Sequence, residues 1–433
     1  MRDILQHRGL RLIFAANIIS MIGSGMNSAA VTWYVLQTTH SEMALGTLLM
    51  LQTIPALLML PFTGVVIDRE DRRRLVMVLD ACRGAVILVV AILAYNGMAK
   101  LWEVYLMSIL VAAGFWMFWP TITALIQELT PESQFVHSNA FLIAGVQGGW
   151  LVAGSLVGFV YNSIGLSGVL FLDFASYMLS FACYLFVRKG RHTVALPPAQ
   201  KHDSAFARFA HELREGIAYI RARPRLMLVG ACWALFIGAM LTQGVITAPF
   251  SDRILNAGAI GYGWLNGGWA IGAFLSAVYT PSLARSAGHL RAIGVSMAVL
   301  GLSLIVLPII GTRLHGRIHL AGAVSVSVAL VAAVLVYCVM GCCRALGGVV
   351  ITSTMMELVP KHFMGRVQNT FYFAGTFLQL ALSFSVGLVA HSWSLAAAFA
   401  MVGSIYLLAC VAGVWPAKTP GPAETAEQAT TTA

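Results

Sequence analysis

The chain has 433 residues, of which 59% are hydrophobic and only 10% are charged, and its mean hydropathy is +0.81. This composition excludes a soluble globular protein, because repeated apolar runs of about 20 residues are long enough to cross the hydrocarbon core of a bilayer. The net charge of +10 is therefore interpreted as membrane topology and not as a nucleic-acid surface.

Twelve apolar segments follow one another along the chain and are predicted to be transmembrane helices of an all-α membrane protein. Their predicted ranges are 10–36, 44–67, 75–96, 102–127, 138–161, 166–187, 226–250, 259–284, 290–311, 327–356, 369–390 and 395–415. One connection, 188–225, is long. Its second part has apolar residues at helical spacing with charges between them, which predicts an amphipathic helix on the membrane surface; these residues are Phe206, Phe209, Leu213, Ile217 and Ile220.

The 27 Lys and Arg residues are distributed unevenly over the connections between these segments. The connections on one side carry only Lys100, Arg253, Arg313 and Arg317, whereas nearly all others fall on the side of the termini and the long linker. Because positive residues stay inside, both termini and the linker are predicted to be cytoplasmic.

Two stretches of the chain are similar in sequence and in topological position, ELTPESQFVHSNAF at 128–141 and ELVPKHFMGRVQNTF at 357–371. They predict two pseudo-symmetric six-helix bundles, an arrangement that places substrate between the halves of a transporter. The predicted domains are an N-terminal six-helix bundle at 1–187, a cytoplasmic linker at 188–225, a C-terminal six-helix bundle at 226–416 and a disordered cytoplasmic tail at 417–433.

Seven charged residues, DREDRRR, are concentrated at 68–74 between the second and third segments. The sequence GVVIDREDRRR resembles the loop 2–3 signature of the major facilitator superfamily. WPTITALIQELTP and ELVPKHFMGRV extend the resemblance, which is to a subgroup of macrolide-efflux and siderophore-export carriers. It implies the fold of that superfamily and a reversible ionic gate on the cytoplasmic face. The expected gate residues are Gly64, Asp68, Arg69, Arg72, Arg73, Gly365 and Arg366; a solvated basic turn that only sets topology is the alternative.

The resemblance also implies that helices 1, 4, 7 and 10 line a central cavity, with 2, 5, 8 and 11 beside them. Aromatic side chains with sparse amides suit a large amphipathic ligand, although packing against lipid or helices is the alternative for each aromatic residue. The substrate-binding candidates are Asn17, Ser24, Asn27, Trp116, Trp119, Gln147, Gln243, Asn266, Trp269, Arg344, Tyr372 and Gln379.

Arg344 is the candidate with the strongest physical argument, because a lone Arg inside a span costs at least about 2.5 kcal/mol unless it faces water or a partner. It is predicted to hold an anionic group of the substrate. The alternative places it at the cytoplasmic end of its helix, snorkelling to the interface. The apolar run from Leu320 to Met356 is too long for one span, so a break is expected, and the repeat favours a deep position.

Acidic residues that could couple transport to an ion gradient are scarce. Asp80 and Arg83 are three residues apart and are predicted to form a local ion pair, while Asp173 lies within the sixth span, where packing or gating is the alternative role. Asp80 and Asp173 are the coupling candidates. Several relatives carry an acidic residue after the Gly of span 1, where this chain has Ser24.

These observations predict a secondary active transporter that exports a hydrophobic or amphipathic small molecule, a drug or a siderophore, by alternating access. The alternative is a lipid, lysolipid or facilitative small-molecule carrier. No phosphate-binding loop for ATP is present, so an ion gradient, with H⁺ as the expected ion, would supply the energy. No enzyme activity, cofactor, metal site or nucleic-acid partner is expected. The predicted form is a monomer that crosses a bacterial inner membrane many times.

Overall fold

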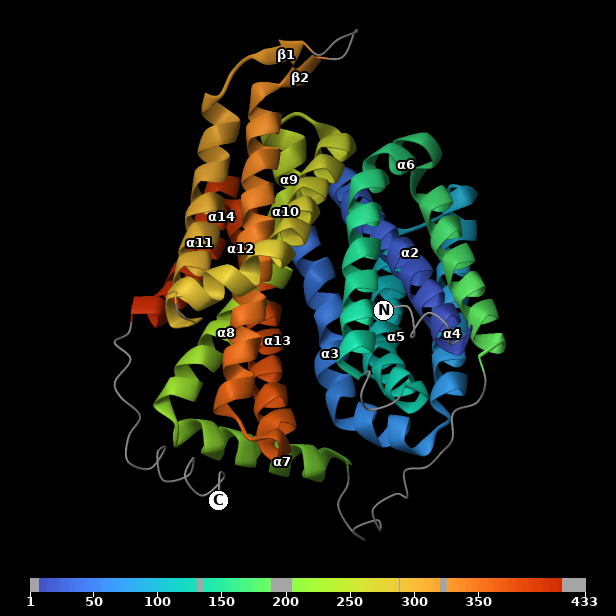
Figure 1. The fold of residues 1–433 in the computed structure, drawn as a ribbon. Coiled ribbons are helices and arrows are strands. Elements are labelled where there is room, and N and C mark those ends of the chain that lie inside the picture. The colour runs from blue at the N-terminus through green and yellow to red at the C-terminus, as the bar shows by residue number, and fades with distance from the viewer. Residues whose placement is uncertain (1–7, 131–134, 188–204, 288, 320–324, 415–433) are drawn as a thin grey trace.

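The computed structural model describes residues 8–130, 135–187, 205–287, 289–319 and 325–414. Within these ranges the chain is almost entirely helical and forms two groups of long helices that stand side by side (Figure 1). By length and apolar composition, nine helices in this part of the chain can cross a bilayer. The predicted all-α membrane fold is therefore confirmed, while the count of twelve transmembrane helices stays a prediction.

The first group, called here the N-half, contains α2 (Arg8–Thr39), α3 (Glu42–Arg69), α4 (Arg72–Tyr95), α5 (Leu101–Leu129) and α6 (Phe135–Leu185). The predicted spans 138–161 and 166–187 both lie in α6, on either side of Gly165. Gly165 has a φ of 65° and a ψ of −170°, a conformation that glycine adopts without steric strain. At this point α6 folds back on itself (Figure 1).

The second group, called here the C-half, contains α8 (Pro224–Thr242), α9 (Gly244–Pro249), the π-helix η2 (Phe250–Ile254), α10 (Gly258–Ala287), α11 (His289–Arg313), α12 (Val328–Leu358), α13 (Lys361–Ser392) and α14 (Leu395–Val414). Between α11 and α12 the strands β1 (Arg317–His319) and β2 (Ser325–Ser327) form an antiparallel hairpin, in which Arg317 lies opposite Ser327. The helices α8, α9 and η2 follow one another directly in the region of the predicted span 226–250.

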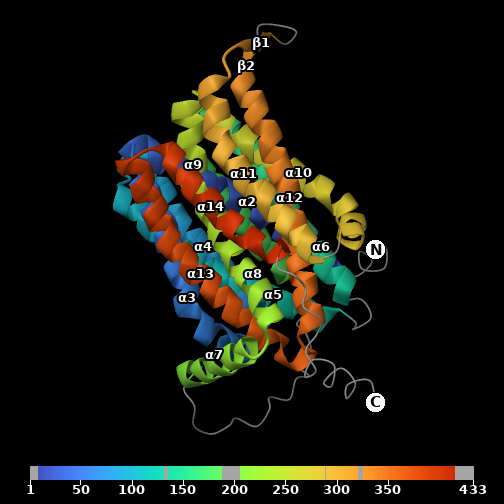
Figure 2. The same ribbon diagram turned by 90° about the vertical axis from the view of Figure 1, so that its left-hand side faces the viewer.

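The linker contributes α7 (Ala205–Arg221), which lies across the ends of the long helices (Figures 1 and 2). The prediction of a helix here is confirmed. Ile220 is buried and Ile217 is exposed, while the side chains of Phe206 and Phe209 lie outside the described residues. Because α7 contacts both α13 and α3, it touches both halves. We call the end of the molecule that carries α7 the linker face and the end that carries β1 and β2 the hairpin face.

The charge cluster at 68–74 forms the turn between α3 and α4 at the linker face. Asp71 is the N-cap of α4, and its Oδ1 accepts a hydrogen bond from the backbone N–H of Arg74 at 3.0 Å. A capping carboxylate satisfies a backbone donor that the helix itself leaves unpaired. The acidic residue at 71 therefore has a local structural role, which the charge pattern alone did not reveal.

The two halves are packed together where α3 meets α13 and where α6 meets α10. Glycines allow this close approach: a Cβ on Gly46 of α3 would lie 2.4 Å from the carbonyl oxygen of Ser383 in α13. Similarly, a Cβ on Gly158 of α6 would lie 2.4 Å from the carbonyl oxygen of Ala259 in α10. Because Gly46 lies near the start of α3, the first of these close contacts lies toward the hairpin face.

Candidate functional site

At the hairpin face an ionic lock joins the two halves. Glu42, in the first turn of α3, is almost fully buried, and its carboxylate pairs with the guanidinium of Arg253 in η2. A second nitrogen of Arg253 donates to the backbone oxygen of His40, and Nδ1 of His391 in α13 lies 3.8 Å from Glu42 Oε2. The sequence analysis missed this lock, because nothing in the local pattern around Glu42 shows that Arg253, more than 200 residues away, is its partner.

A charged pair lies in the interior of the N-half. Asp80 and Arg83, both in α4, form the predicted ion pair, and Ser180 Oγ in α6 donates to Asp80 Oδ2 at 2.6 Å. The Arg83 guanidinium lies between two rings, 4.4 Å from the centroid of Phe118 and 4.5 Å from that of Tyr177. Both charged side chains are about 1% exposed or less, so the pair is fully desolvated.

The second coupling candidate, Asp173, is completely buried in α6 and faces α2. Asn27 Nδ2 donates to Asp173 Oδ2 at 2.7 Å, and Ser176 Oγ lies 3.3 Å from Asp173 Oδ1. One turn from Asp173, the hydroxyl of Tyr177 and Ser24 Oγ are 2.8 Å apart. Both Ser24 and Asn27, predicted as substrate-binding residues, are thus engaged with α6 in this conformation.

In the C-half, Arg344 occupies the middle of α12, which begins at Val328 and ends at Leu358. The helix begins directly after β2. This strand interrupts the apolar run from Leu320 to Met356, as the length of that run predicted. The guanidinium of Arg344 lies 4.3 Å from the ring centroid of Trp269 in α10 and within electrostatic reach of Tyr406 in α14. No carboxylate among the described residues forms an ion pair with Arg344.

Two predicted aromatic residues meet between the halves. Trp116 of α5 and Tyr372 of α13 are in edge-to-face contact, with ring centroids 5.8 Å apart. Trp119, one turn further along α5, packs against the apolar core of the N-half instead. The pair Trp116 and Tyr372 therefore forms an aromatic contact between the two halves, whereas Trp119 belongs to the packing alternative.

The predicted amides are scattered. Gln243 is buried at the end of α8 near Tyr337, Asn266 Nδ2 donates to the backbone oxygen of Tyr262 in its own helix, and Gln379 is buried with Oε1 lacking a hydrogen-bond partner. Gln147 has a side chain outside the described residues. Gln243, Asn266 and Gln379, the three whose side chains the structure describes, make no hydrogen bond with one another.

The predicted cytoplasmic gate is only partly described, because the side chains of Gly64, Asp68, Arg69 and Gly365 lie outside the described residues. Arg73 donates to the backbone oxygens of Tyr184 and Leu185, each at 2.7 Å, and so ties the turn to the end of α6.

The other two gate arginines also pair without joining the halves. Arg72 lies 3.6 Å from Glu128 of α5, and Arg366 lies 2.8 Å from Glu215 of α7. The Arg72 contact lies within the N-half, and the Arg366 contact joins the C-half to the linker helix α7.

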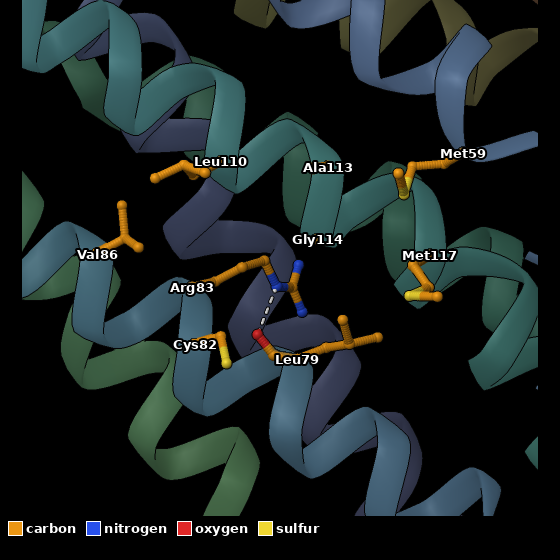
Figure 3. A pocket seen from close by; sticks show the side chains of 9 residues that line it. All are labelled: Met59, Leu79, Cys82, Arg83, Val86, Leu110, Ala113, Gly114 and Met117. Carbon is orange, nitrogen blue, oxygen red and sulfur yellow. Dashed lines mark hydrogen bonds between the residues drawn. The ribbon is translucent and has the colours of Figure 1, made fainter. Parts of the chain in front are cut away.

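A pocket of about 260 Å³ lies within the N-half between α3, α4 and α5 (Figure 3). Its walls are Met59, Met117 and other mostly apolar side chains, together with the stem of Arg83. Gly114 gives that stem room, since a Cβ at Gly114 would lie 2.7 Å from Arg83 Cγ and Cδ. None of the predicted substrate-binding residues lines this pocket. Among the described residues no group of His, Cys, Asp or Glu is arranged to hold a metal ion.

Two helical halves are joined by glycine contacts and an ionic lock at one face, and the C-half carries Arg344, a cation without a carboxylate partner among the described residues; these features are typical of a multi-pass membrane transport protein. The chain belongs to the Major Facilitator Superfamily, whose family model matches residues 13–383. The predicted family and fold are confirmed.

Among curated proteins, the chain is 24% identical over 420 residues to the uncharacterised MFS-type transporter YkuC of Bacillus subtilis, covering 90% of this chain and 86% of that one. It is 23% identical over 227 residues to macrolide efflux protein A of Streptococcus pyogenes, covering 51% and 54%.

Among solved structures, the nucleoside transporter NupG gives a TM-score of 0.74 at 12% identity, covering 94% of this chain and all of the other. A bacterial homologue of the iron transporter ferroportin in an inward-facing state gives a TM-score of 0.70 at 16% identity, covering 95% and 99%. These similarities concern the fold alone.

Proposed function

We propose that this protein is a secondary active transporter that exports an amphipathic small molecule bearing an anionic group, a drug or a siderophore, by alternating access and at the expense of an ion gradient. The observation that carries the proposal is Arg344, a cation at the middle of α12 stacked on Trp269 and without a carboxylate partner among the described residues. Such a cation is retained inside a membrane when it serves a polar partner, here the substrate anion. The aromatic pair Trp116 and Tyr372 supplies stacking area for the apolar part.

Export rather than import is supported by the similarity to macrolide efflux protein A. In this proposal the linker face is cytoplasmic, the protein lies in a bacterial inner membrane with both termini inside, and the conformation described is closed to the outside by the Glu42–Arg253 lock. The basic turn with Asp68, Arg72 and Arg73 would form the corresponding cytoplasmic gate when the molecule opens outward.

Everted membrane vesicles test this function with dansyl-phenylalanine, an aromatic amphiphile with one carboxylate, and with its neutral methyl ester. We expect protonophore-sensitive uptake of the acid, and a decrease of about tenfold in Arg344→Gln, because a charge-assisted hydrogen bond is worth about 1.5 kcal/mol or more. Uptake of the ester should change little, and Arg344→Lys should restore part of the uptake of the acid because it restores the charge.

Arg291→Gln, an exposed Arg near the start of α11, is the matched control and should leave both fluxes unchanged. A catecholate siderophore tested alongside decides between the two substrate classes. Equal losses for acid and ester in Arg344→Gln would show that Arg344 acts on the structure and not on the anion. Uptake that is insensitive to the protonophore would favour a facilitative carrier.

A further inference from the structure

One face of α2 carries a continuous line of polar side chains. Asn17, Ser20, Ser24 and Asn27 are spaced three, four and three residues apart, a spacing that places side chains above one another on a helix. All four lie in the inner part of α2, and the line begins about 14 Å from the first residue of the helix, given a rise of 1.5 Å per residue; the turn before Asn17 carries the buried apolar residues Ile13 and Phe14. The contacts of Ser24 and Asn27 show that this face of α2 is turned toward α6.

Most of this line lacks hydrogen-bond partners. Both polar atoms of the Asn17 side chain, the hydroxyl of Ser20 and Oδ1 of Asn27 are buried without a partner, and the three residues are between 0% and 5% exposed. Buried polar groups in native proteins are satisfied by protein or by ordered water, and water enters sites that offer two or more polar partners. Four such atoms on one helix face, two of them on Asn17 and one each on Ser20 and Asn27, are therefore more consistent with a hydrated site than with an apolar contact.

The line ends at Asp173, which forms no salt bridge with any of the described residues. From α4 the charged groups Asp80 and Arg83 face it, but they are paired with each other. From α6 itself Tyr177 lies nearby, and α2 offers only the neutral Asn27 and Ser24. A buried carboxylate without a paired cation is strongly disfavoured, so a proton is the natural neutralising partner at Asp173.

We propose that the α2 face from Asn17 to Asn27 is a hydrated path, about 15 Å long, along which protons move to and from Asp173, and that Asp173 carries the coupling proton. The coupling role rests on the proposed function. A proton bound at a carboxylate oxygen converts Asp173 to the neutral acid, and its release restores the anion without any other change of bonding. Asn27 suits both forms, because Nδ2 donates to the carboxylate and Oδ1, which has no partner, accepts from the acid O–H.

Infrared spectroscopy tests the path without any substrate. The protein, reconstituted in lipid with ¹³C-labelled aspartate, is titrated with pH, and the C=O band of a protonated, buried aspartic acid is followed. We expect this band to be absent in Asp173→Asn and to remain in Asp252→Asn, a matched change in η2 at the hairpin face. The rate at which the band shifts on transfer to D₂O should fall at least tenfold in Asn17→Leu and in Ser20→Ala.

Ser108→Ala is the control for Ser20→Ala, because Ser108 is equally buried but its hydroxyl already donates to the backbone oxygen of Val104; its exchange rate should equal that of the wild type. A band that persists in Asp173→Asn, or exchange that is unchanged in both path variants, overturns the proposal. Each variant is first checked for a native size-exclusion profile.

Proteoliposomes separate the coupling role from the proposed function. With dansyl-phenylalanine inside and outside, we expect Asp173→Asn to exchange the compound at the rate of the wild type but to lose gradient-driven accumulation. Accumulation that is retained in Asp173→Asn overturns the coupling role. If the wild-type protein shows no exchange at all, the proposed function fails, while the infrared experiment still decides the path.

Discussion

Arg253→Gln is expected to shift the molecule toward a conformation that is open at the hairpin face. In the closed conformation the Glu42 carboxylate is 2% exposed, and Arg253 provides the only arginine or lysine contact described for it. Removal of the guanidinium leaves the buried Glu42 carboxylate without its arginine partner. Opening of the hairpin face would expose this carboxylate to water. With allowance for the partial exposure of Arg253, we expect an effect of about 2 kcal/mol, roughly a thirtyfold change in the ratio of the two conformations.

The partner variant Glu42→Gln should have a smaller effect in the same direction. Arg253 is 42% exposed, and water can solvate its charge after the carboxylate has gone, so less free energy is lost. This ordering of the two variants follows from their unequal burial and would not be expected for a pair at the surface.

The populations can be measured by fluorescence energy transfer between dyes on Gln37→Cys in the N-half and Ser392→Cys in the C-half, in a background whose seven native cysteines are replaced by alanine. Arg313→Gln, which removes an exposed Arg from the same face, is the control. If Arg253→Gln and the control give the same distance distribution as the parent, the lock does not hold this face closed.

Asp80→Leu is expected to give the largest loss of stability among the variants considered. It removes the partner of a guanidinium that is 1% exposed and that cannot reach water without disrupting the packing of α4, α5 and α6. Breaking a buried ion pair on one side costs about 3–5 kcal/mol. The two cation–π contacts of Arg83 with Phe118 and Tyr177 are already present in the parent protein, so they do not replace the lost carboxylate.

The double variant Asp80→Leu with Arg83→Met should recover most of the stability, because apolar replacement of both partners removes the desolvation penalty. Unfolding of the purified protein in detergent, for the parent, the two single variants and the double variant, gives the coupling energy of the pair. If the two single effects simply add in the double variant, the pair is not a unit. Ser180, which donates to Asp80, is kept as serine in every variant of the cycle.

The fold could be predicted from the sequence to a large extent. Apolar runs near 20 residues, the uneven placement of Lys and Arg and the resemblance of GVVIDREDRRR to a family signature led to the correct family, and the spacing of Asp80 and Arg83 led to the correct ion pair. Arg344 was expected deep in its span; it lies in the middle of α12, which begins only after β2, while its depth in the membrane stays a prediction. Each of these properties is encoded within a short stretch of chain.

The candidate site could be predicted only in part. Of the amides chosen for their residue type, Gln243, Asn266 and Gln379 make no hydrogen bond with one another, and Trp119 packs against the core of the N-half. The Glu42–Arg253 lock, the contact of Asn27 with Asp173 and the lack of partners for Asn17 and Ser20 had no signal that a single sequence could provide. Each depends on which face a helix turns to a neighbour that is distant in the chain.

The sequence by itself determined that this protein is a polytopic membrane protein, because hydropathy and charge placement are each encoded in continuous stretches of chain, and the resemblance of GVVIDREDRRR to a family signature indicated the major facilitator type. Only the tertiary structure decided which charges are paired, which face is locked and which polar groups are left without partners. The physical reason is that the free energy of a buried charge or polar atom depends on the groups within a few ångströms of it, and in this fold those groups come from helices whose contacting residues lie 100 and 146 residues apart in the chain.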